Sequence, residues 1–400
     1  MKPIALIIPW YGDDAIGGAE KECNYLAQAL QNAGQKVEVF TTCVKNVLSD
    51  MGKNAIKPGT YTENEITVKR FPVRENRDIA AYINSNERIY KGDNFSLEDE
   101  EVYFREDMNS PEMYAYIREN KDKYRAFLLI PYMYGVVYNA SFECIDKSIL
   151  IPCLHNESYA YMSLMKEKMK TYKGMIFLSM PEYELAKSIY DLSNVKTAVP
   201  GGGIDTGWKD SVNPKSFREK YNINDEFILF AGRKDAGKKA DELAAFFMRF
   251  KDENPSSKLK LVYLGGGELP IEIPDRFEDD ILDLGFVSVE DKQNAFAAAA
   301  IFCNPSHFES FSLVIMESWI AKRPVLVSGF CDVTKHFCIE SNGGLYYNGY
   351  DEFYYCVKYL LENTQIADKM GENGHLYVMS HFTHDIIAEK YLRFIEETLE

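Results

Sequence analysis

The chain has 400 residues, of which 46% are hydrophobic, and it carries a formal net charge of −16 at pH 7. This length fits two domains of roughly 200 residues each, and the apolar content excludes intrinsic disorder. The acidic balance argues against a general nucleic-acid binder and weakens any polybasic attachment to anionic lipid. A local basic cluster can still hold a diphosphate, because charges are screened within roughly 8 Å at physiological salt.

The first residues show no targeting segment. The apolar run 4–8 is short and is followed by Pro9 and Trp10 without a small-residue cleavage site, which predicts a strand and not a signal peptide. No stretch reaches the ~18 apolar residues of a membrane-spanning helix. The eight cysteines are scattered without a C-x-x-C pair, so buried free thiols in a reducing cytoplasm are the simplest interpretation.

The first half of the chain predicts a parallel sheet with helices between its strands. Residues 3–8 form a continuous apolar run, as a strand covered on both faces should, and residues 9–18 form a loop rich in Gly and Asp. From Gly18, apolar residues recur at helical spacing as far as a left-handed cap at Gly34, and residues 37–41 read as the next strand. This order is one βαβ unit.

The rest of the first half is less uniform. We interpret residues 44–125 as mostly irregular, with one strand candidate near 66–71 and an acidic stretch at 97–101. The tyrosines of this segment are candidates to stack on the face of a ligand, although any one of them can equally pack in a core. They include Tyr82, Tyr90, Tyr103 and Tyr114. Strand patterns return near residues 127–130, 149–154, 174–179 and 195–199.

The second half repeats the alternation of strands and helices, with a largely helical C-terminal end. Its strands are expected near residues 227–231, 259–264, 300–304 and 324–328. We place the domain junction at Gly201-Gly202-Gly203. The pattern predicts an α/β protein with two Rossmann-like, doubly wound domains facing a central cleft. These are residues 1–200 and 201–382; a C-terminal helix at about 383–400 can pack back onto the first domain.

The sharpest polar constellation follows the strand near 300–304. Glu309 lies on the loop after this strand, and Glu317 lies about one turn into the next helix. A strand-loop-helix turn at the carboxyl edge of a sheet can aim both carboxylates into one crevice, while backbone N–H groups at the helix start can hold an anion. Two solvated surface glutamates would show the same spacing.

This pattern resembles the E-x(7)-E signature of glycosyltransferase family 4, whose members are retaining enzymes of the GT-B fold. The resemblance covers residues 227–395 well and the first half in pieces. It implies that residues 1–200 bind the acceptor, where the tyrosines of residues 44–125 are candidates to stack on sugar rings, and that residues 201–382 bind the donor. It also implies that Glu309 contacts the donor sugar and that Glu317 binds the nucleotide ribose. It also implies that the helix start contacts the donor, through Phe311, Ser312 and Leu313. The chain departs from the family pattern at positions where glycine is usual, which are Lys239, Ser310, Ser312 and Lys322.

A basic turn follows the strand 227–231. Arg233 and Lys238 can converge on one diphosphate, Arg as a fork and Lys as a point charge, although a solvated basic turn would look the same. The G-R-x(4)-K pattern of the resembling family falls on these two residues, which implies that they bind the diphosphate. The nucleotide base is expected near Phe286 and Val287, where backbone groups would recognise it.

Residues of the first half complete the expected donor site. The family has a Gly-Gly-x-Glu sequence at the position of Gly17 and Gly18, which implies that their backbone approaches the donor closely. The family also has a histidine near His155 that touches the donor sugar, although a histidine at the end of a strand is as often a structural hydrogen bonder. Gly203-Ile204-Asp205 resembles the Gly-Val-Asp of the family's domain junction, where we favour a hinge.

Several motifs are missing from the sequence. There is no D-x-D, no Walker pattern, no G-x-G-x-x-G after the first strand, no H-E-x-x-H and no G-x-S-x-G. The histidines of the helical C-terminal region are expected to be solvated or packed; they are His375, His381 and His384. We therefore expect no metal site and no cofactor other than the sugar nucleotide used as a substrate.

The resemblance implies retaining, metal-independent transfer of a hexosyl group from a nucleoside-diphosphate sugar to a hydroxyl of a saccharide, lipid-linked or other acceptor. The setting would be surface polysaccharide or glycoconjugate synthesis by a cytoplasmic protein with at most weak peripheral membrane contact. Two alternatives stay open. One is a nucleotide-sugar epimerase of the same fold, and the other is a catalytically silent sugar-nucleotide-binding partner subunit. The sequence does not reveal the sugar, the base, the acceptor or the oligomeric state.

Overall fold

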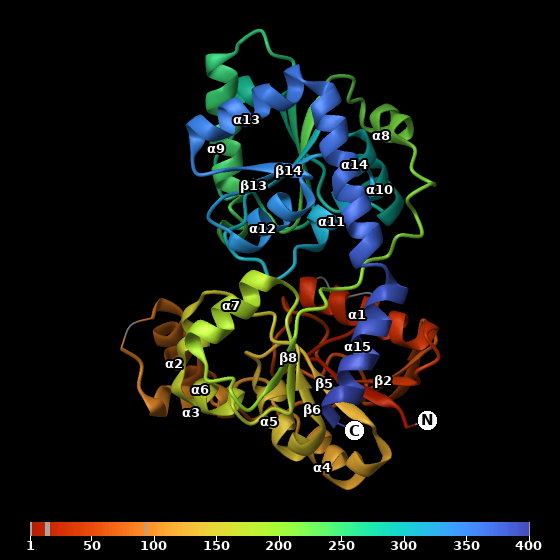
Figure 1. Ribbon diagram of the computed structural model, residues 1–400. Helices are drawn as coiled ribbons and strands as arrows, with labels where there is room; N and C mark the ends of the chain where they lie inside the picture. The colour runs from red at the N-terminus through yellow and green to blue at the C-terminus, as the bar shows by residue number, and fades with distance from the viewer. Residues whose placement is uncertain (1, 13–16, 93, 400) are drawn as a thin grey trace. The chain divides into compact units, whose positions relative to one another are not determined.

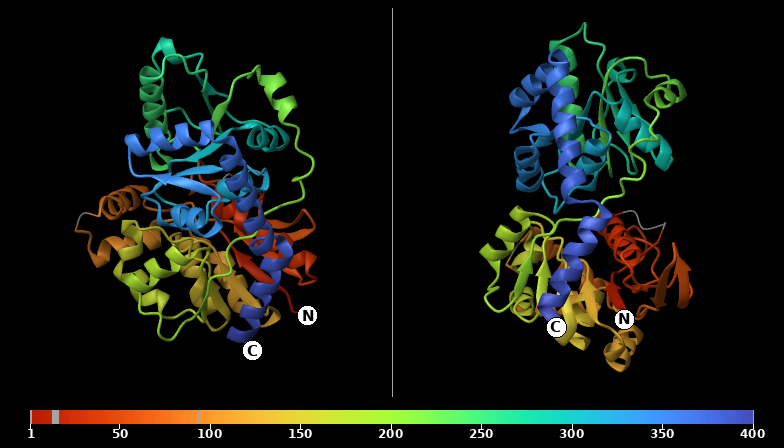
Figure 2. Two further views of the ribbon diagram at one scale, coloured as in Figure 1. Left: turned by 45° about the horizontal axis from the view of Figure 1, so that its top comes forward. Right: turned by 45° about the vertical axis from the view of Figure 1, so that its right-hand side comes forward.

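The computed structural model describes residues 2–12, 17–92 and 94–399, and it divides the chain into two compact units. Unit 1 comprises Met1–Gly203 together with His384–Glu400, and unit 2 comprises Ile204–Thr383. The expected boundaries at residues 200 and 382 lie next to these limits. Helices cover both faces of the sheet in each unit (Figures 1 and 2), so the predicted α/β class with two parallel-sheet domains is confirmed.

Unit 1 is built on an eight-stranded sheet in the order β3-β4-β2-β1-β5-β6-β7-β8. All neighbouring strands pair in parallel except β3, which runs antiparallel to β4. The strands are β1 (Ile4–Ile7), β2 (Val37–Thr42), β3 (Gly59–Glu63), β4 (Ile66–Phe71), β5 (Ala126–Leu129), β6 (Ser148–Leu150), β7 (Gly174–Ile176) and β8 (Lys196–Ala198). The central strands β1, β2 and β5 are buried along their whole length, which explains the continuous apolar sequences of β1 and β5.

The helices of unit 1 cover this sheet, and their apolar side chains contribute to its hydrophobic core. They are α1 (Gly18–Asn32), α2 (Ile79–Lys91), α3 (Leu97–Glu106), α4 (Pro111–Asn120), α5 (Gly135–Glu143), α6 (Ser163–Met169), α7 (Met180–Ile189) and α15 (His384–Leu399). The C-terminal helix α15, dark blue in Figure 1, lies against α1. It also packs against β7, because a Cβ atom on Gly174 would lie 3.0 Å from the ring of Phe394.

The expectation that residues 44–125 are mostly irregular is wrong. This segment holds two strands, β3 and β4, and three helices, α2 to α4. Each helix begins at a side-chain cap: Asp78 accepts from Ala81, Ser96 forms a capping box with Asp99, and Ser110 precedes Pro111 at the first helical position. These start signals are readable in the sequence and predict where the three helices begin.

Unit 2 is built on a six-stranded parallel sheet in the order β11-β10-β9-β12-β13-β14. The strands are β9 (Phe227–Ala231), β10 (Lys260–Leu264), β11 (Ile281–Asp283), β12 (Ile301–Asn304), β13 (Val325–Ser328) and β14 (Gly344–Tyr347). The helices are α8 (Pro214–Tyr221), α9 (Ala240–Glu253), α10 (Val289–Ala298), α11 (Leu313–Ile320), α12 (Asp332–Ser341), α13 (Tyr350–Glu362) and α14 (Thr364–His381). Counting from β9, this is the 3-2-1-4-5-6 order of a doubly wound fold.

Strand order fixes where each unit can bind a ligand. In a doubly wound sheet, a crevice opens at the carboxyl ends of the two strands where the winding reverses direction. In unit 2 these strands are β9 and β12, which are adjacent and parallel. In unit 1 they are β1 and β5. The loops that follow these four strands are therefore the first places to look for chemistry.

Candidate functional site

The two loops at the reversal point of unit 2 are joined by an ion pair. Lys238 lies in the turn between β9 and α9, and its Nζ atom is 2.9 Å from Oε1 of Glu309, which lies in the loop after β12. The side chain of Glu309 is only 12% exposed and that of Lys238 is 31% exposed. The structure thus brings together two of the predicted site residues at the position that the strand order favours.

Asn304, the last residue of β12, organises the same loop. Its Nδ2 atom donates to Oε1 of Glu309 at 3.3 Å and to Oγ of Ser312 at 2.9 Å. Ser312 is the N-cap residue of α11, and its φ of 69° lies in the left-handed region. The sequence analysis gave Asn304 no role; its signal is its place at a strand end directly before the loop.

Glu317 lies on α11 and is held from another helix. Nζ of Lys292, on α10, lies 2.7 Å from Oε1 and 2.6 Å from Oε2 of Glu317. The side chain of Glu317 is 12% exposed, so this carboxylate is largely shielded by protein. Lys292 was missed at the sequence level, because no spacing rule links a residue of α10 to one of α11.

The basic turn after β9 divides its cations among different partners. Arg233 is half exposed, and its Nε atom lies 3.3 Å from Oδ2 of Asp235. Lys234 is buried, and its Nζ atom lies 2.5 Å from Oδ1 of Asp283 at the end of β11. Lys234 therefore ties the ends of two strands together, whereas Arg233 and Lys238 remain accessible to a ligand.

The predicted base-binding residues lie in a glycine-rich part of the same sheet edge. Gly265 donates to the carbonyl of Gly285 at 2.7 Å, and a Cβ atom on Gly265 would lie 2.1 Å from the carbonyl oxygen of Gly232. The ring of Phe286 is 73% exposed and lies over Gly266, where a Cβ atom would come within 2.6 Å of it. Val287 follows and is half-buried. This edge offers backbone groups and one open aromatic face.

Phe311 and Leu313 stand at the start of α11 but differ in what they expose. The ring of Phe311 is 3% exposed and packs edge-on against Phe337 and Phe382. Only its backbone is therefore available to a ligand. Leu313 is the first residue of α11, and Ser312 provides no side-chain cap for the helix. The N–H groups of this first turn are suited to bind an anion.

Three of the positions where the resembling family has glycine adopt a left-handed backbone. The φ angles are 56° for Lys239, 69° for Ser312 and 58° for Lys322. Residues with a Cβ atom rarely adopt this region, which gives a physical reason for glycine at these places. The fourth position, Ser310, is not among the residues with positive φ in the described part of the chain.

At the reversal point of unit 1, Gly17 is the N-cap residue of α1. The side chain of Glu20 folds back over Gly17, and a Cβ atom there would overlap with this carboxylate. Nε1 of Trp10, in the loop after β1, donates to the Glu20 carboxylate, and the ring of Trp10 packs edge-on against Tyr134 at 5.1 Å. Nothing lies within 4 Å of a Cβ atom built on Gly18, so its backbone is open.

His155 lies beyond the end of β6 in unit 1, beside a partly buried acid. Nδ1 of His155 is 3.8 Å from Oε1 of Glu157, which accepts a hydrogen bond from the Tyr132 hydroxyl at 3.2 Å. Burial raises the pKa of Glu157 to about 7, although the hydrogen bond from Tyr132 lowers it. This carboxyl group can therefore gain or lose a proton near neutral pH. Glu157 was not recognised from the sequence.

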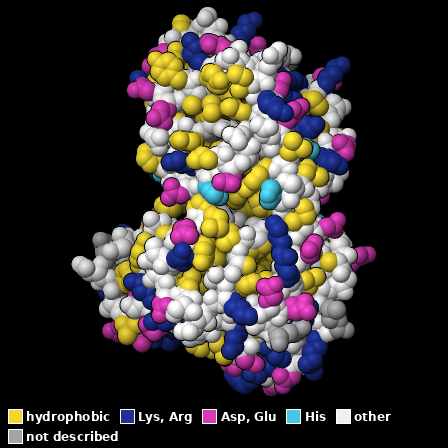
Figure 3. Space-filling view, viewed as in Figure 1, with side chains coloured by type: hydrophobic (Ala, Val, Ile, Leu, Met, Phe, Trp, Pro, Cys, Tyr) yellow, Lys and Arg dark blue, Asp and Glu magenta, His cyan; other side chains and the backbone are white. Residues whose placement is uncertain are grey.

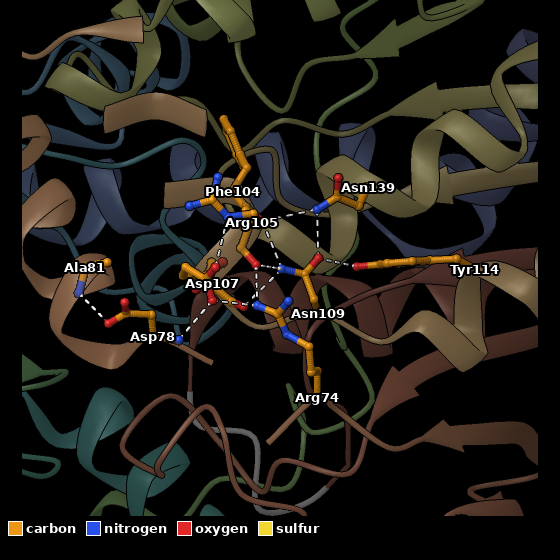
Figure 4. Close-up of polar contacts among 10 residues, drawn as sticks. Arg74, Asp78, Ala81, Phe104, Arg105, Asp107, Asn109, Tyr114 and Asn139 are labelled. Atoms are coloured by element: carbon orange, nitrogen blue, oxygen red, sulfur yellow. Dashed lines mark hydrogen bonds and ion pairs between the residues drawn. The ribbon is translucent and has the colours of Figure 1, made fainter. Parts of the chain in front are cut away.

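A polar network in unit 1 ties the end of α3 to neighbouring helices (Figure 4). Oδ1 of Asn109 accepts from the Tyr114 hydroxyl at 2.6 Å and from Nδ2 of Asn139 at 2.7 Å. Oδ2 of the buried Asp107 accepts from the backbone of Gly135 at 2.5 Å. Tyr114 is therefore part of this hydrogen-bond network and has a structural role.

The other candidate tyrosines of residues 44–125 differ in exposure. Tyr103 is 2% exposed and stacks on Tyr82, with their ring centroids 5.6 Å apart. Tyr90 is 72% exposed and is the one of the named four whose ring is largely open to solvent. The side chains of Tyr82 and Tyr114 pack against the core of unit 1. Core packing thus explains three of the four tyrosines.

Among the described residues, no group of three or more His, Cys, Asp and Glu side chains could hold a metal ion. All eight cysteines are free, and six of them are buried. Within residues 2–12, 17–92 and 94–399, no helix has the length and apolar character needed to cross a membrane.

Comparison with known proteins agrees with this geometry. Residues 225–363 match the family model described as glycosyl transferases group 1. An uncharacterized glycosyltransferase of Methanocaldococcus jannaschii is 24% identical over 254 residues, which cover 58% of this chain and 63% of that relative. The matched region thus spans less than two thirds of the relative's own length.

Two solved structures have a similar fold. The sucrose-phosphate synthase of Thermosynechococcus elongatus superposes with a TM-score of 0.71 at 16% identity, covering 99% of both chains. HepE of Anabaena, in complex with UDP and glucose, superposes with a TM-score of 0.69 at 14% identity, covering 99% of this chain and 100% of that one. The fold is therefore GT-B, as predicted. Fold and family match together support a group 1 glycosyltransferase of the GT-B type.

Proposed function

We propose that the chain transfers a hexosyl group from a nucleoside-diphosphate sugar to a hydroxyl group of a glycan or other acceptor, with retention of configuration. One observation carries this proposal. At the reversal point of the unit 2 sheet, Lys238 and Glu309 lie 2.9 Å apart, so a cation for a diphosphate and a carboxylate for a sugar are neighbours. A site that breaks the bond between a sugar and a diphosphate needs a cation for the diphosphate and a carboxylate for the sugar close together.

The departing diphosphate needs positive charge around it as the bond to the sugar breaks. Arg233 and Lys238 are the accessible cations of the turn after β9. The uncapped first turn of α11 adds backbone N–H groups and the positive end of a helix dipole. These groups would stabilise the charge that develops on the leaving group, which is how preorganised donors accelerate a reaction.

The carboxylates would orient the donor. Glu309, held by Lys238 and Asn304, would accept hydrogen bonds from sugar hydroxyls. Glu317, held by Lys292, would accept from the ribose hydroxyls of the nucleotide. A carboxylate offers about four lone-pair positions, so one carboxylate can accept hydrogen bonds from a lysine and from two hydroxyl groups at the same time. The exposed ring of Phe286 would cover the base.

The acceptor would be bound by unit 1, as the sequence predicts for residues 1–200. We further propose that the reaction needs no metal ion and no cofactor, because the basic turn and the helix terminus can carry the charge. HepE of Anabaena, which shares the fold, has been crystallised with UDP-glucose, so UDP-sugars are the first donors to test. Synthesis of surface polysaccharide or glycoconjugate in the cytoplasm is the setting that we propose.

The test is a thermal-shift screen with UDP, GDP, ADP and their sugars, followed by an assay of nucleotide release with and without acceptor. A ligand that binds only the folded state stabilises it by RT ln(1 + [L]/Kd), so the correct donor should raise Tm most. Release of nucleotide that rises with an added glycan acceptor would support transfer. Binding without release would favour the silent partner subunit, and conversion of the donor without release would favour an epimerase.

A further inference from the structure

A second cationic site lies in unit 1, outside the loops described above. It is a pocket of about 380 Å³ between the edge strand β8 and the C-terminal helix α15, and we name it the β8–α15 pocket. Its lining residues are Lys196, Thr197, Ala198, Val199, Pro200, Lys390, Arg393, Phe394 and Glu397. In the part of Figure 3 that corresponds to β8 and α15 in Figure 1, Lys and Arg side chains gather at the surface, with some acidic side chains beside them.

The charges in this pocket do not balance. Its lining holds three cations, Lys196, Lys390 and Arg393, against one carboxylate, that of Glu397. The chain as a whole has the opposite balance, with a formal net charge of −16. A local excess of positive charge on an acidic protein favours an anion at this place over the rest of the surface.

Two of the three cations, Lys196 and Arg393, have no acidic partner among the described residues. Nζ of Lys196 donates to the backbone carbonyl of Glu397, and Nζ of Lys390 donates to that of Pro200 at 3.1 Å. The guanidinium of Arg393 makes no hydrogen bond or ion pair with the described residues, and it is exposed. Burial and the neighbouring charge of Arg393 lower the pKa of Lys390. This repulsion between cations would be relieved by a bound anion.

The strand edge adds further donors. In the pairing of β7 with β8, Lys196 donates to Lys173 and Phe177 donates to Ala198, so Lys196 and Ala198 face β7. Because successive residues of a strand point their backbone groups to opposite sides, the N–H groups of Thr197 and Val199 face away from β7. β8 is the last strand of its sheet, so these groups lie on the open edge of the sheet, and both residues line the pocket.

We propose that the β8–α15 pocket binds the phosphate group of an anionic ligand, independently of the donor site. A phosphate oxygen can accept from the fork of Arg393, from the Lys196 ammonium and from the edge N–H groups together, which suits a tetrahedral acceptor better than a planar carboxylate. Phe394 and Pro200 line the same pocket with apolar surface, which fits the carbon part of a phosphate ester. The ester is a soluble molecule or a lipid headgroup, and the test separates the two.

The experiment measures binding of two probes to the full chain. Inorganic phosphate and glycerol 3-phosphate are titrated and followed by phosphorus NMR line broadening. Phosphatidylcholine vesicles, with or without phosphatidylglycerol, are tested by co-sedimentation. The variants are Lys196→Gln with Arg393→Gln, and Arg393→Gln alone, which keeps the contact between Lys196 and α15. Arg233→Gln with Lys238→Gln removes phosphate binding at the proposed donor site, so that the two sites are counted separately.

Loss of both pocket cations should weaken binding of at least one probe by about tenfold or more, and Arg393→Gln alone should weaken it in part. Binding that depends on the pocket should persist in the donor-site variant. If binding of the soluble phosphates depends on the pocket cations, the ligand is a soluble molecule. If only binding to phosphatidylglycerol vesicles depends on them, the ligand is a lipid headgroup. A matched control is Lys91→Gln with Lys170→Gln, two exposed lysines of unit 1 outside the pocket. Equal loss in this control, or no loss in the pocket variants with either probe, would overturn the proposal.

Discussion

Lys292 holds both carboxylate oxygens of Glu317, at 2.7 and 2.6 Å, from a different helix. The lysine side chain is 21% exposed and lies 5.6 Å from the centre of the Phe296 ring, so it is fixed by packing as well as by charge. This pair sets where the Glu317 carboxylate points. If Glu317 binds the ribose of the donor, Lys292 is its positioning residue.

The first prediction therefore concerns Lys292. Replacing it by Met keeps much of the volume but removes the charge, so Glu317 loses its orientation. The KM for the donor should rise by about tenfold, as for Glu317→Ala, because a hydrogen bond to a charged group is worth about 1.5–3 kcal/mol. The value of kcat should change much less. Steady-state kinetics with varied donor would measure both constants.

The control for this prediction is Lys220→Met. Lys220 lies on α8, and its Nζ atom is 2.6 Å from Oδ2 of Asp291, which lies on α10 like Lys292. This change should leave the donor KM as it is. If both Lys292→Met and Glu317→Ala leave the donor KM unchanged and have a native melting curve, Glu317 does not bind the ribose.

The second prediction concerns the leaving group. Arg233→Ala and Lys238→Ala should each lower kcat by about 10²-fold or more, which is typical when one preorganised transition-state contact is lost. Arg233→Lys should also be poor, because a point charge cannot reproduce the guanidinium fork. Activity should survive EDTA. Activity that vanishes in EDTA and returns with added metal would contradict the proposed mechanism.

Most of the fold could be predicted from the sequence, and the reason is physical. Strands buried on both faces, such as Phe227–Ala231, must be apolar throughout, and such runs are easily read. Short or exposed strands carry no such signal: β3 is exposed and β11 has three residues. The helices of residues 44–125 do carry a local signal, because each of them begins at a capping residue, Asp78, Ser96 or Ser110.

Prediction of the candidate site had a different limit. Glu309 and Lys238 stand on loops that follow adjacent strands, and a motif can point to both. Lys292, Lys234 and Glu157 gain their roles from partners far away in the chain. No local pattern marks such residues, because their partners are set by how the helices and strands pack.

The third prediction concerns backbone strain at Lys322, directly after α11. This residue has a φ of 58°, and its N–H donates to the carbonyl of Trp319 at 2.9 Å, as at the end of many helices. Lys322→Gly should raise the free energy of unfolding by about 1 kcal/mol, because glycine adopts the left-handed region at no steric cost. Lys322→Ala should give no such gain. Urea unfolding of the three proteins would test this, and equal gains in both variants would contradict it.

The last prediction concerns Glu22, a buried acid of α1. Its Oε1 atom accepts from the backbone of Gly203 at 3.0 Å, while Oε2 has no hydrogen-bond partner among the described residues. Burial raises the pKa of Glu22 from 4.5 to about 8, although the bond from Gly203 lowers it. Between these two values the folded chain keeps a proton that the unfolded chain releases, so the contribution of Glu22 to stability falls as the pH rises.

Glu22→Gln removes this titration while keeping an oxygen that can accept from Gly203. The variant should therefore gain stability relative to the native chain as the pH is raised from about 5 to 8, with a slope difference of up to about 1.4 kcal/mol per pH unit. Glu182 is present in both proteins, and its pKa is raised to about 8 chiefly by burial and least by the charge of Glu22, so its own titration largely cancels in the comparison. Glu98→Gln, an exposed acid of α3, is the control and should run parallel to the native chain. Melting curves across this range decide the matter: if Glu22→Gln also runs parallel, Glu22 does not hold a proton in the folded protein.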